Sequence, residues 1–166
     1  MLVESSDTAD SEHVYEIMST KAVTQYSNNI RSNFGYVSRA NDVDPFAEDK
    51  LFHQEGRKVF KEVCPMAVEH ISEHLARHQL SSEDVSRWWL HQANINMNTL
   101  ISRKLLDRQP TLDEAPIVLD TFANTASAGS IIAFYQYHKD LISGDIGLLC
   151  SFGAGYSIGS LVLKKL

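Results

Sequence analysis

The strongest pattern of hydrophobic and polar positions in this chain is helical and begins near residue 48. Apolar residues recur at spacings of three and four, as on the buried face of a helix, at Val59, Phe60, Val63, Ala67, Ile71 and Leu75. Pro65 lies within this run and predicts a kink or a break, because proline lacks the amide hydrogen that an inner helical turn donates. The pattern therefore predicts a long, interrupted helix packed on a core.

Two more helices are predicted further along the chain. Residues 94–107 place apolar side chains inward at helical spacing, namely Ile95, Leu100, Ile101 and Leu105. Residues 127–143 are largely apolar and predict a third helix. Residues 81–84 pair two serines with Glu83 and Asp84, which predicts a short capped turn.

Short apolar runs between turn residues predict the strands. These runs are residues 87–91, 116–119, 146–151 and 156–163, with further ones at 1–4 and 13–18. Residues 24–46 are rich in Asn, Asp and Gly, which predicts a long loop of the kind that often carries function. The order of elements predicts one α/β domain over residues 1–166, with a mixed β-sheet, helices packed on it and an antiparallel strand pair at the C-terminus.

Composition narrows the class of protein. The chain has 166 residues, of which 43% are hydrophobic and 22% charged, as in a globular domain with a real core. A net charge of -6 argues against binding to nucleic-acid phosphates. Two cysteines are too few for a disulfide framework and suit a reducing cytoplasm, and the first residues show no signal-peptide pattern. Residues 146–163 carry no charge, but their four glycines and three serines favour two buried strands over a membrane span.

Three segments each place a polar or glycine-rich turn after an apolar run. They are HQAN at residues 91–94, ANTASAGS at 123–130 and FGAG at 152–155. In an α/β sheet, ligands bind where such strands end. Together the segments offer a neutral imidazole, a carboxamide and a close-approach backbone loop. This set of donors suits a carbonyl oxygen that becomes negatively charged during a reaction.

These motifs, in this order, resemble those of 3-oxoacyl-acyl-carrier-protein synthase III, a condensing enzyme of fatty-acid synthesis with the thiolase-like fold. HQAN matches the histidine motif of that family. Residues 123–130 resemble its asparagine motif with Ala123 where glycine is usual, and residues 152–155 resemble its final glycine turn with Ala154 where glycine is common. GRKVFK at residues 56–61 resembles the start of its long helix. The resemblance covers residues 50–166 and implies a thiolase-like half-domain, the C-terminal half of such an enzyme.

The resemblance implies an acyltransferase that performs a decarboxylative Claisen condensation of an acyl thioester with a malonyl thioester. His91 and Asn124 are expected to donate hydrogen bonds to the malonyl thioester oxygen, which requires His91 to be neutral. The Ala154 amide, next to Gly153, is expected to be an oxyanion donor. Phe152 is expected to wall the site.

The same resemblance implies the ligands. Gly56, Phe60 and Asn94 are expected to line the pantetheine arm of acyl-CoA, acyl-carrier-protein or malonyl-acyl-carrier-protein thioesters. No metal or other cofactor is expected. Asn96 stands where the family often has a basic residue that faces the carrier protein. The nearby cations that offer a substitute are Arg57, Lys58, Arg103 and Lys104.

Neither cysteine fits the nucleophile of this family. Cys64 lies in the first helical run and Cys150 in an apolar strand, whereas a reactive thiolate needs exposure and an electropositive setting. We therefore expect the chain to be a fragment or one half of a split enzyme, inactive alone, or a non-catalytic subunit that pairs with a cysteine-bearing half. We also expect the apolar surface of an isolated half to drive self-association, as a two-fold dimer burying well over ~1,000 Å².

A rival pattern lies in the first helical run. His70, Glu73 and His74 match the H-x-x-E-H signature of a zinc hydrolase, with His78 one turn further on. The alternative is a solvated helix face that also carries Glu69 and Arg77. The solvated face is favoured, because the pattern is short and shows no third ligand.

Overall fold

The computed structural model describes residues 2–32 and 52–166. Its main sheet has four strands in the order β1-β6-β5-β4. They are β1 (Tyr15–Ser27), β4 (Val85–Leu90), β5 (Ile146–Gly153) and β6 (Gly155–Lys165). β4 and β5 run parallel, whereas β6 is antiparallel to both β5 and β1. The predicted mixed sheet with a C-terminal antiparallel pair is therefore confirmed.

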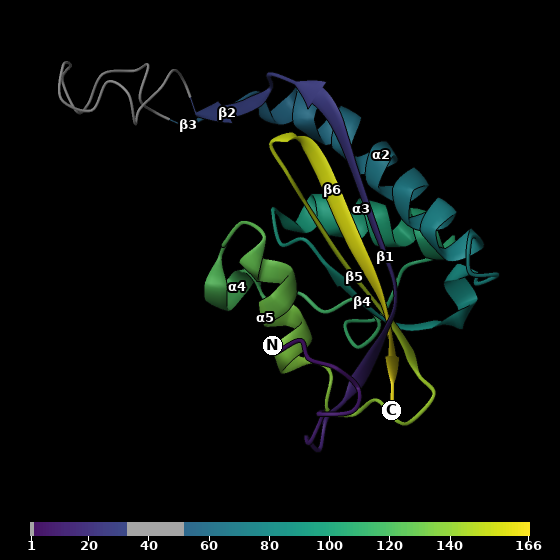
Figure 1. Cartoon of the computed structure of the whole chain (residues 1–166). Helices are drawn as coiled ribbons and strands as arrows, with labels where there is room; N and C mark the ends of the chain where they lie inside the picture. The colour runs from purple at the N-terminus through teal and green to yellow at the C-terminus, as the bar shows by residue number, and fades with distance from the viewer. Residues whose placement is uncertain (1, 33–51) are drawn as a thin grey trace, which may run out of the picture.

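Helices cover both faces of this sheet (Figure 1). The long helix α2 (Gly56–Ala76) and α3 (Ile95–Leu106) lie on one face, and the short α4 (Leu119–Phe122) and α5 (Ala128–Gln136) lie on the other. A small sheet of β2 (Ile30–Ser32) and β3 (Phe52–Gln54) extends from one end, and the 3-10 turn η2 (Ser82–Asp84) precedes β4.

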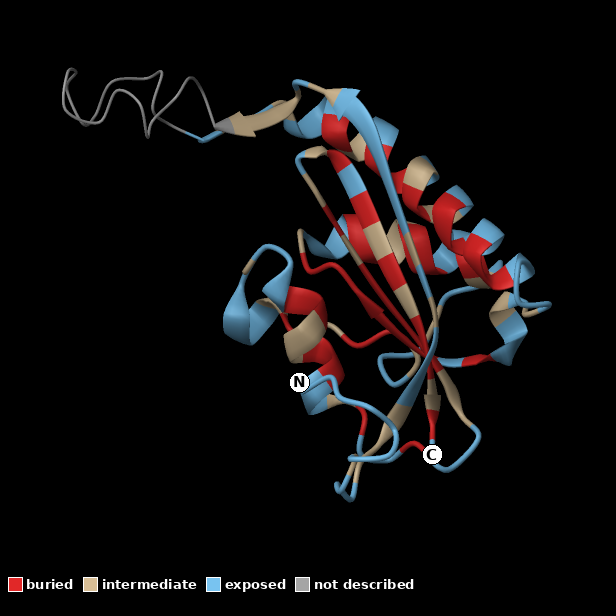
Figure 2. Cartoon of the chain, in the orientation of Figure 1, coloured by how far each residue is buried: buried red, intermediate tan, exposed pale blue. Residues whose placement is uncertain are grey.

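Alternating side chains of the central strands build two separate cores. Trp88 and Leu90 belong to the core under α2 and α3, whereas Trp89 between them belongs to the core under α5. Leu148 and Leu149 of β5 divide in the same way. Because successive strand residues point to opposite faces, a continuous apolar run is buried on both sides. Figure 2 shows that most of β4 and β5 is buried.

Trp89 sets a close-packing requirement on the neighbouring strand. Its indole lies where a side chain at Gly147 would be, since a Cβ there would meet the ring at 2.1 Å. The indole Nε1 donates to the Tyr137 carbonyl oxygen at 3.1 Å. Only glycine at position 147 therefore allows this tryptophan to fill the core under α5.

Several predicted elements differ from the structure. α2 is one unbroken helix, so the predicted break at Pro65 is wrong. Proline has no N–H to donate to the carbonyl oxygen of Lys61, one turn earlier. Because Pro65 and Lys61 are both exposed, water can donate a hydrogen bond to that oxygen instead. Ile95 is 57% exposed rather than inward-facing, because α3 begins there and buries Met97 instead. The third helix ends at Gln136 rather than at residue 143.

The segment 116–119 is not a strand, which corrects another prediction. Residues 116–118 are not assigned to any regular element, and α4 begins at Leu119. The segment is held by the Gln92 side chain, whose amide donates to the Pro116 carbonyl oxygen at 3.2 Å and whose oxygen accepts from the Val118 amide at 3.1 Å. A side chain thus supplies bonds that a neighbouring strand would otherwise make.

The N-terminal region is more regular than its composition suggests. Residues 2–4 form no strand, whereas the strand predicted at 13–18 is confirmed and extends to Ser27. Residues 24–27 and 30–32 of the predicted loop belong to β1 and β2, and residues 33–46 of it lie outside the described residues. The capped turn is confirmed, because Ser81 and Asp84 form a capping box at η2.

The uncharged stretch 146–163 forms β5 and most of β6, as predicted. In the described part of the chain, no helix has the length and apolar character needed to span a membrane.

Candidate functional site

The register of β4 and β5 places His91 beside Ser151. Leu90, the last residue of β4, pairs with Cys150 of β5, so the next positions along the two parallel strands are His91 and Ser151. The His91 Nδ1 atom and the Ser151 Oγ atom lie 3.0 Å apart. The imidazole also packs on the Phe152 ring, with 4.3 Å between the ring centroids. Two neighbouring strand ends therefore fix both the position and the plane of the imidazole.

His91 is a neutral imidazole at physiological pH. Its side chain is only 7% exposed, and this burial lowers its pKa to about 4. Its Nε2 atom forms no hydrogen bond with any described residue and is not among the sealed, unpartnered atoms, so Nε2 remains open to solvent. The site therefore contains a buried ring with one nitrogen held by the protein and the other available to a ligand.

Asn124 lies in the loop between α4 and α5 and presents its amide group outward. Its Oδ1 atom accepts a hydrogen bond from the Ala126 amide at 2.9 Å, while its Nδ2 has no partner in the described ranges. The carboxamide is therefore oriented with its two N–H donors free. Ala123 before it has a φ of 54° and a ψ of -158°, a region that favours glycine. Glycine would adopt this geometry without strain from a Cβ atom.

Gln92 ties the His91 strand end to the segment before α4. Its side chain is fully buried and, besides holding residues 116–118, donates to the Leu90 carbonyl oxygen at 3.0 Å. It also lies against the first turn of α5, since a Cβ at Gly129 would meet the Gln92 Cβ at 2.8 Å. Sequence reasoning missed Gln92 as a positioning residue, although it lies inside the HQAN motif.

The final glycine turn joins β5 to β6. Phe152 is buried against His91, Gly153 is the last residue of β5, and Ala154 is exposed at the tip. Gly155 has a φ of 133°, which a side chain would strain. The turn thus presents the Ala154 backbone near the end of the strand that carries Ser151.

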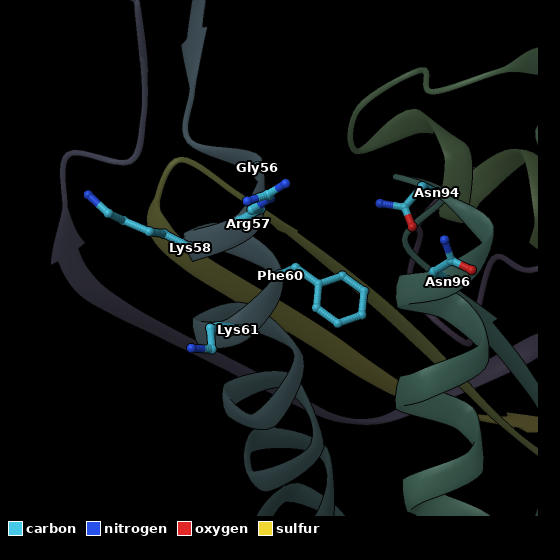
Figure 3. Close-up of a pocket in the computed structure, with 7 residues that line it drawn as sticks. All are labelled: Gly56, Arg57, Lys58, Phe60, Lys61, Asn94 and Asn96. Carbon is cyan, nitrogen blue, oxygen red and sulfur yellow. The ribbon is translucent and has the colours of Figure 1, made fainter.

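A pocket of about 660 Å³ opens between the start of α2 and the start of α3. Figure 3 shows Phe60 from α2 facing Asn94 and Asn96 from α3, with Gly56 at the upper end of α2. Asn94 also caps α3, because its Oδ1 accepts from the Met97 amide at 3.0 Å. The structure therefore gathers Gly56, Phe60 and Asn94 in one pocket, and their part in binding pantetheine stays a prediction.

The two histidines of the H-x-x-E-H pattern on α2 pack against the sheet. His70 Nε2 and His74 Nδ1 both lie within hydrogen-bond distance of Ser160 Oγ on β6, at 2.9 and 2.7 Å, and His74 Nε2 lies 2.9 Å from Ser19 Oγ on β1. Glu73 instead accepts from Lys21 Nζ at 2.7 Å. Among the described residues no group of three or more metal-ligating side chains converges.

The prediction of a solvated helix face is also wrong for these histidines. His70 and His74 are 4% and 1% exposed, sealed between α2 and the sheet, and burial lowers the pKa of each to about 4. His78, one turn on, is exposed. The face that carries the first two histidines is therefore core, and only the third position is solvated.

Both cysteines are buried and free. Burial raises the pKa of the Cys64 thiol to about 11 and that of the Cys150 thiol to about 12. Neither forms a thiolate readily, which agrees with the expectation that the nucleophile does not come from these positions.

Comparison with known proteins decides the family. Residues 75–165 match the model of the 3-oxoacyl-[acyl-carrier-protein (ACP)] synthase III C-terminal family. The chain is 57% identical over 165 residues to the beta-ketodecanoyl-[acyl-carrier-protein] synthase of Pseudomonas aeruginosa, which covers 99% of this chain and 47% of that protein. The beta-ketoacyl-[acyl-carrier-protein] synthase III of Lactobacillus helveticus is 30% identical over 127 residues, covering 75% of this chain and 37% of that protein.

The chain belongs to the 3-oxoacyl-[acyl-carrier-protein] synthase III family.

Solved structures of the family share the fold. The synthase III of Aquifex aeolicus superposes with a TM-score of 0.74 at 21% identity, over 93% of this chain and 46% of that chain. The synthase III of Pseudomonas aeruginosa gives 0.71 at 18% identity, over 89% and 44%. The predicted thiolase-like fold and synthase III family are therefore confirmed. The chain spans about half, or less, of the length of the relatives that it matches.

Proposed function

We propose that this chain supplies the malonyl-thioester side of a synthase III condensing site, with the nucleophilic cysteine on a separate half. The observation that carries the proposal is the pair of polarised donors: a neutral His91 with an open Nε2, and an Asn124 whose amide oxygen is already occupied by the Ala126 amide. Both stand at strand or helix ends, where α/β folds bind ligands.

The proposed step is loss of carbon dioxide from a malonyl thioester. The bond between the α-carbon and the carboxylate breaks, and its electron pair forms an enolate with negative charge on the thioester oxygen. His91 and Asn124 donate hydrogen bonds to that oxygen. The enolate carbon then attacks the carbonyl carbon of the acyl group held as a thioester on the cysteine, a carbon–carbon bond forms, and the carbon–sulfur bond breaks to release the cysteine as a thiolate. Donors aimed at a developing oxyanion typically contribute about 10²–10³ each to the rate.

We propose that the two donors converge on one ligand. His91 directly follows β4, which packs against α5 through Trp89. Asn124 lies in the loop that leads directly into α5. Phe152 covers the imidazole, and we propose that its ring keeps water from the enolate, while the Ala154 amide beside Gly153 serves the oxyanion of the acyl-cysteine step.

The pocket of Figure 3 suits the pantetheine arm of the thioester. Phe60 supplies an apolar wall, Asn94 a polar one, and Gly56 leaves open space, since no atom lies within 4 Å of where its Cβ would be. At the rim, Arg57 and Lys61 are exposed and form no ion pair with a described residue, whereas Lys58 pairs with Glu55. We propose that Arg57 and Lys61 replace the missing basic residue at Asn96 in docking an acidic carrier protein.

The Pseudomonas aeruginosa relative is named as a synthase of the β-ketodecanoyl thioester. Condensation with a malonyl unit lengthens the acyl chain by the two carbons left after decarboxylation. We therefore propose an octanoyl thioester as the primer and malonyl-acyl-carrier protein as the extender. A cytoplasmic location stays a prediction, which the two free cysteines support.

The outer side of α5 and α4 supports pairing with a second half. Tyr135 is 67% exposed and Phe122 37% exposed, although both belong to apolar segments. We propose that a cysteine-bearing half covers this surface, or in its absence a second copy of the chain. Light scattering on the purified chain is expected to show a dimer, and a monomer at high concentration would count against self-association.

The test of the function combines this chain with the remaining half of the Pseudomonas aeruginosa relative. Octanoyl-CoA and malonyl-acyl-carrier protein are supplied, and the 3-oxodecanoyl product is measured by mass spectrometry. The chain alone is expected to form none, and the pair is expected to be active. Product from the chain alone would show that the nucleophile lies within it. A pair that stays active with Asn124→Ala, relative to the exposed control His78→Ala, would favour a non-catalytic role.

A further inference from the structure

We infer that Ser151 is a positioning residue that donates its hydroxyl proton to His91 Nδ1 and thereby fixes the imidazole as the tautomer with its proton on Nε2. This inference deepens the proposed function and rests on it for its role in catalysis. Its structural part concerns only Ser151 and His91.

The first observation is the geometry of the pair. Ser151 Oγ and His91 Nδ1 lie 3.0 Å apart, and the bond spans 60 residues of sequence. A neutral imidazole carries one N–H, so either Nδ1 accepts from the hydroxyl or it donates to the hydroxyl. The two arrangements give opposite roles to Nε2, which donates in the first and only accepts in the second.

The second observation is the surroundings of the two groups. Ser151 Oγ has no other hydrogen-bond partner in the described ranges, so a hydroxyl that accepted from Nδ1 would have no protein acceptor for its own proton. When the Ser151 hydroxyl donates to Nδ1, one hydrogen bond gives both the hydroxyl proton and the Nδ1 lone pair a partner. Nε2, open to solvent, then carries the N–H.

The third observation is that no charged group among the described residues competes with this arrangement. Burial lowers the pKa of His91, and no acidic or basic side chain of the described ranges contributes to the shift. Within these ranges, no carboxylate therefore draws the proton to Nδ1, as one does in hydrolytic triads. A single neutral hydroxyl decides the tautomer.

The test uses the ¹⁵N-labelled chain without substrate. Long-range ¹H–¹⁵N correlation spectra at neutral pH are expected to show His91 Nε2 at the protonated ring position and Nδ1 at the unprotonated one. In Ser151→Ala the two nitrogen shifts are expected to move toward each other, as the tautomers mix, and Ser151→Thr is expected to restore the wild-type pattern. A wild-type Nδ1–H tautomer, or an unchanged Ser151→Ala spectrum, would overturn the inference.

The selectivity of the effect needs a control. Ser160→Ala is the matched control, since it removes another serine next to histidine on the adjacent strand and is expected to shift the His70 and His74 signals but not those of His91.

These measurements separate the inference from the proposed function. If His91 carries its proton on Nε2 but the pair of halves forms no product, the proposed function is contradicted while the positioning role of Ser151 still holds. In an active pair, Ser151→Ala is expected to lower kcat about fivefold with little change in KM, because the imidazole would still occupy its place.

Discussion

The described part of the chain buries histidines next to serines in two regions, and we propose a ligand-binding role for only one of them. At the ends of β4 and β5, His91 meets Ser151 and keeps Nε2 open. Under α2, His70 and His74 share Ser160, and His74 also reaches Ser19. Burial lowers the pKa of all three imidazoles to about 4, so the rings have the same charge. What separates a donor site from a structural clamp is a ring nitrogen that a ligand can reach.

The structural clamp has a physical purpose of its own. Ser19 lies at an irregularity in the pairing of β1 with β6, and His74 holds it there from α2. Lys21 on the same strand donates to the His70 carbonyl oxygen at 3.0 Å and to Glu73. These polar contacts fix the register of an edge strand whose side chains are otherwise mostly exposed.

Removal of the open imidazole gives the largest expected effect on activity. In the complex with the cysteine-bearing half, His91→Ala is expected to lower kcat about 10²–10³-fold, because one of two donors to the enolate oxygen is lost. The measurement is release of carbon dioxide from malonyl-acyl-carrier protein. His78→Ala, on the exposed side of α2, is the control and should keep full activity. A decrease in kcat of less than tenfold in His91→Ala would contradict the role of His91 as a hydrogen-bond donor to the enolate.

Removal of the clamp is expected to cost stability instead. His74→Ala leaves the Ser19 hydroxyl without its partner, leaves Ser160 with His70 alone and opens a cavity, so the free energy of unfolding should fall by about 2–4 kcal/mol. Urea titration followed by circular dichroism measures this. Ser72→Ala, at an exposed position on the same helix, provides the baseline. Equal stability of the two variants would show that the clamp is not structural.

The pH dependence tests both regions together. Each of His70, His74 and His91 has a folded pKa of about 4 against 6.5 when unperturbed. Between these pH values the histidines are protonated in the unfolded chain and neutral in the folded chain. The free energy of unfolding therefore falls as the pH is lowered from 6.5 to about 4, by about 1.4 kcal/mol per pH unit for each histidine. Burial also lowers the pKa of His138, which adds to the same slope. Denaturant titrations across this range should show that His91→Ala reduces the slope by the contribution of one histidine. A flat profile would contradict the buried, neutral state of these rings.

Backbone strain gives the smallest expected effect. Ala123, before Asn124, has a φ of 54° in a region suited to glycine, whereas the clamp has no such residue. Ala123→Gly is therefore expected to raise the free energy of unfolding by about 1 kcal/mol. Ala128→Gly, in the first turn of α5, should lower it by a similar amount. A destabilised Ala123→Gly variant would show that position 123 is not strained.

Local patterns predicted much of the fold because they report on short-range physics. Asn94 caps α3 as its position before an apolar run suggests, and the capping box at η2 follows from Ser81 and Asp84. The predicted break at Pro65 failed because helical packing along α2 outweighs one missing bond on the solvent side. The strand predicted at 116–119 failed because the Gln92 side chain, 24 and 26 residues away, replaces the neighbouring strand.

The motifs also predicted the set of candidate site residues, but not their supports. HQAN drew attention to His91 and Asn94, while Gln92 and Ser151 gave no signal of their own. Gln92 is a polar residue with no exposed surface, and its value lies in bonds to the loop before α4. Ser151 is an ordinary strand residue until the parallel register places it beside His91.

The sequence by itself determined the family, the order of the elements and the motifs that carry the donors, because these depend on residue type and short spacing. The tertiary structure alone decided that His70 and His74 are sealed in the core, whereas His91 keeps one ring nitrogen open. The partners of His74 and His91 lie 86 and 60 residues away, on strands whose register no local pattern specifies. Burial and accessibility of a ring nitrogen are properties of packed surfaces, so H-x-x-E-H became part of the core and HQAN became one side of a candidate site.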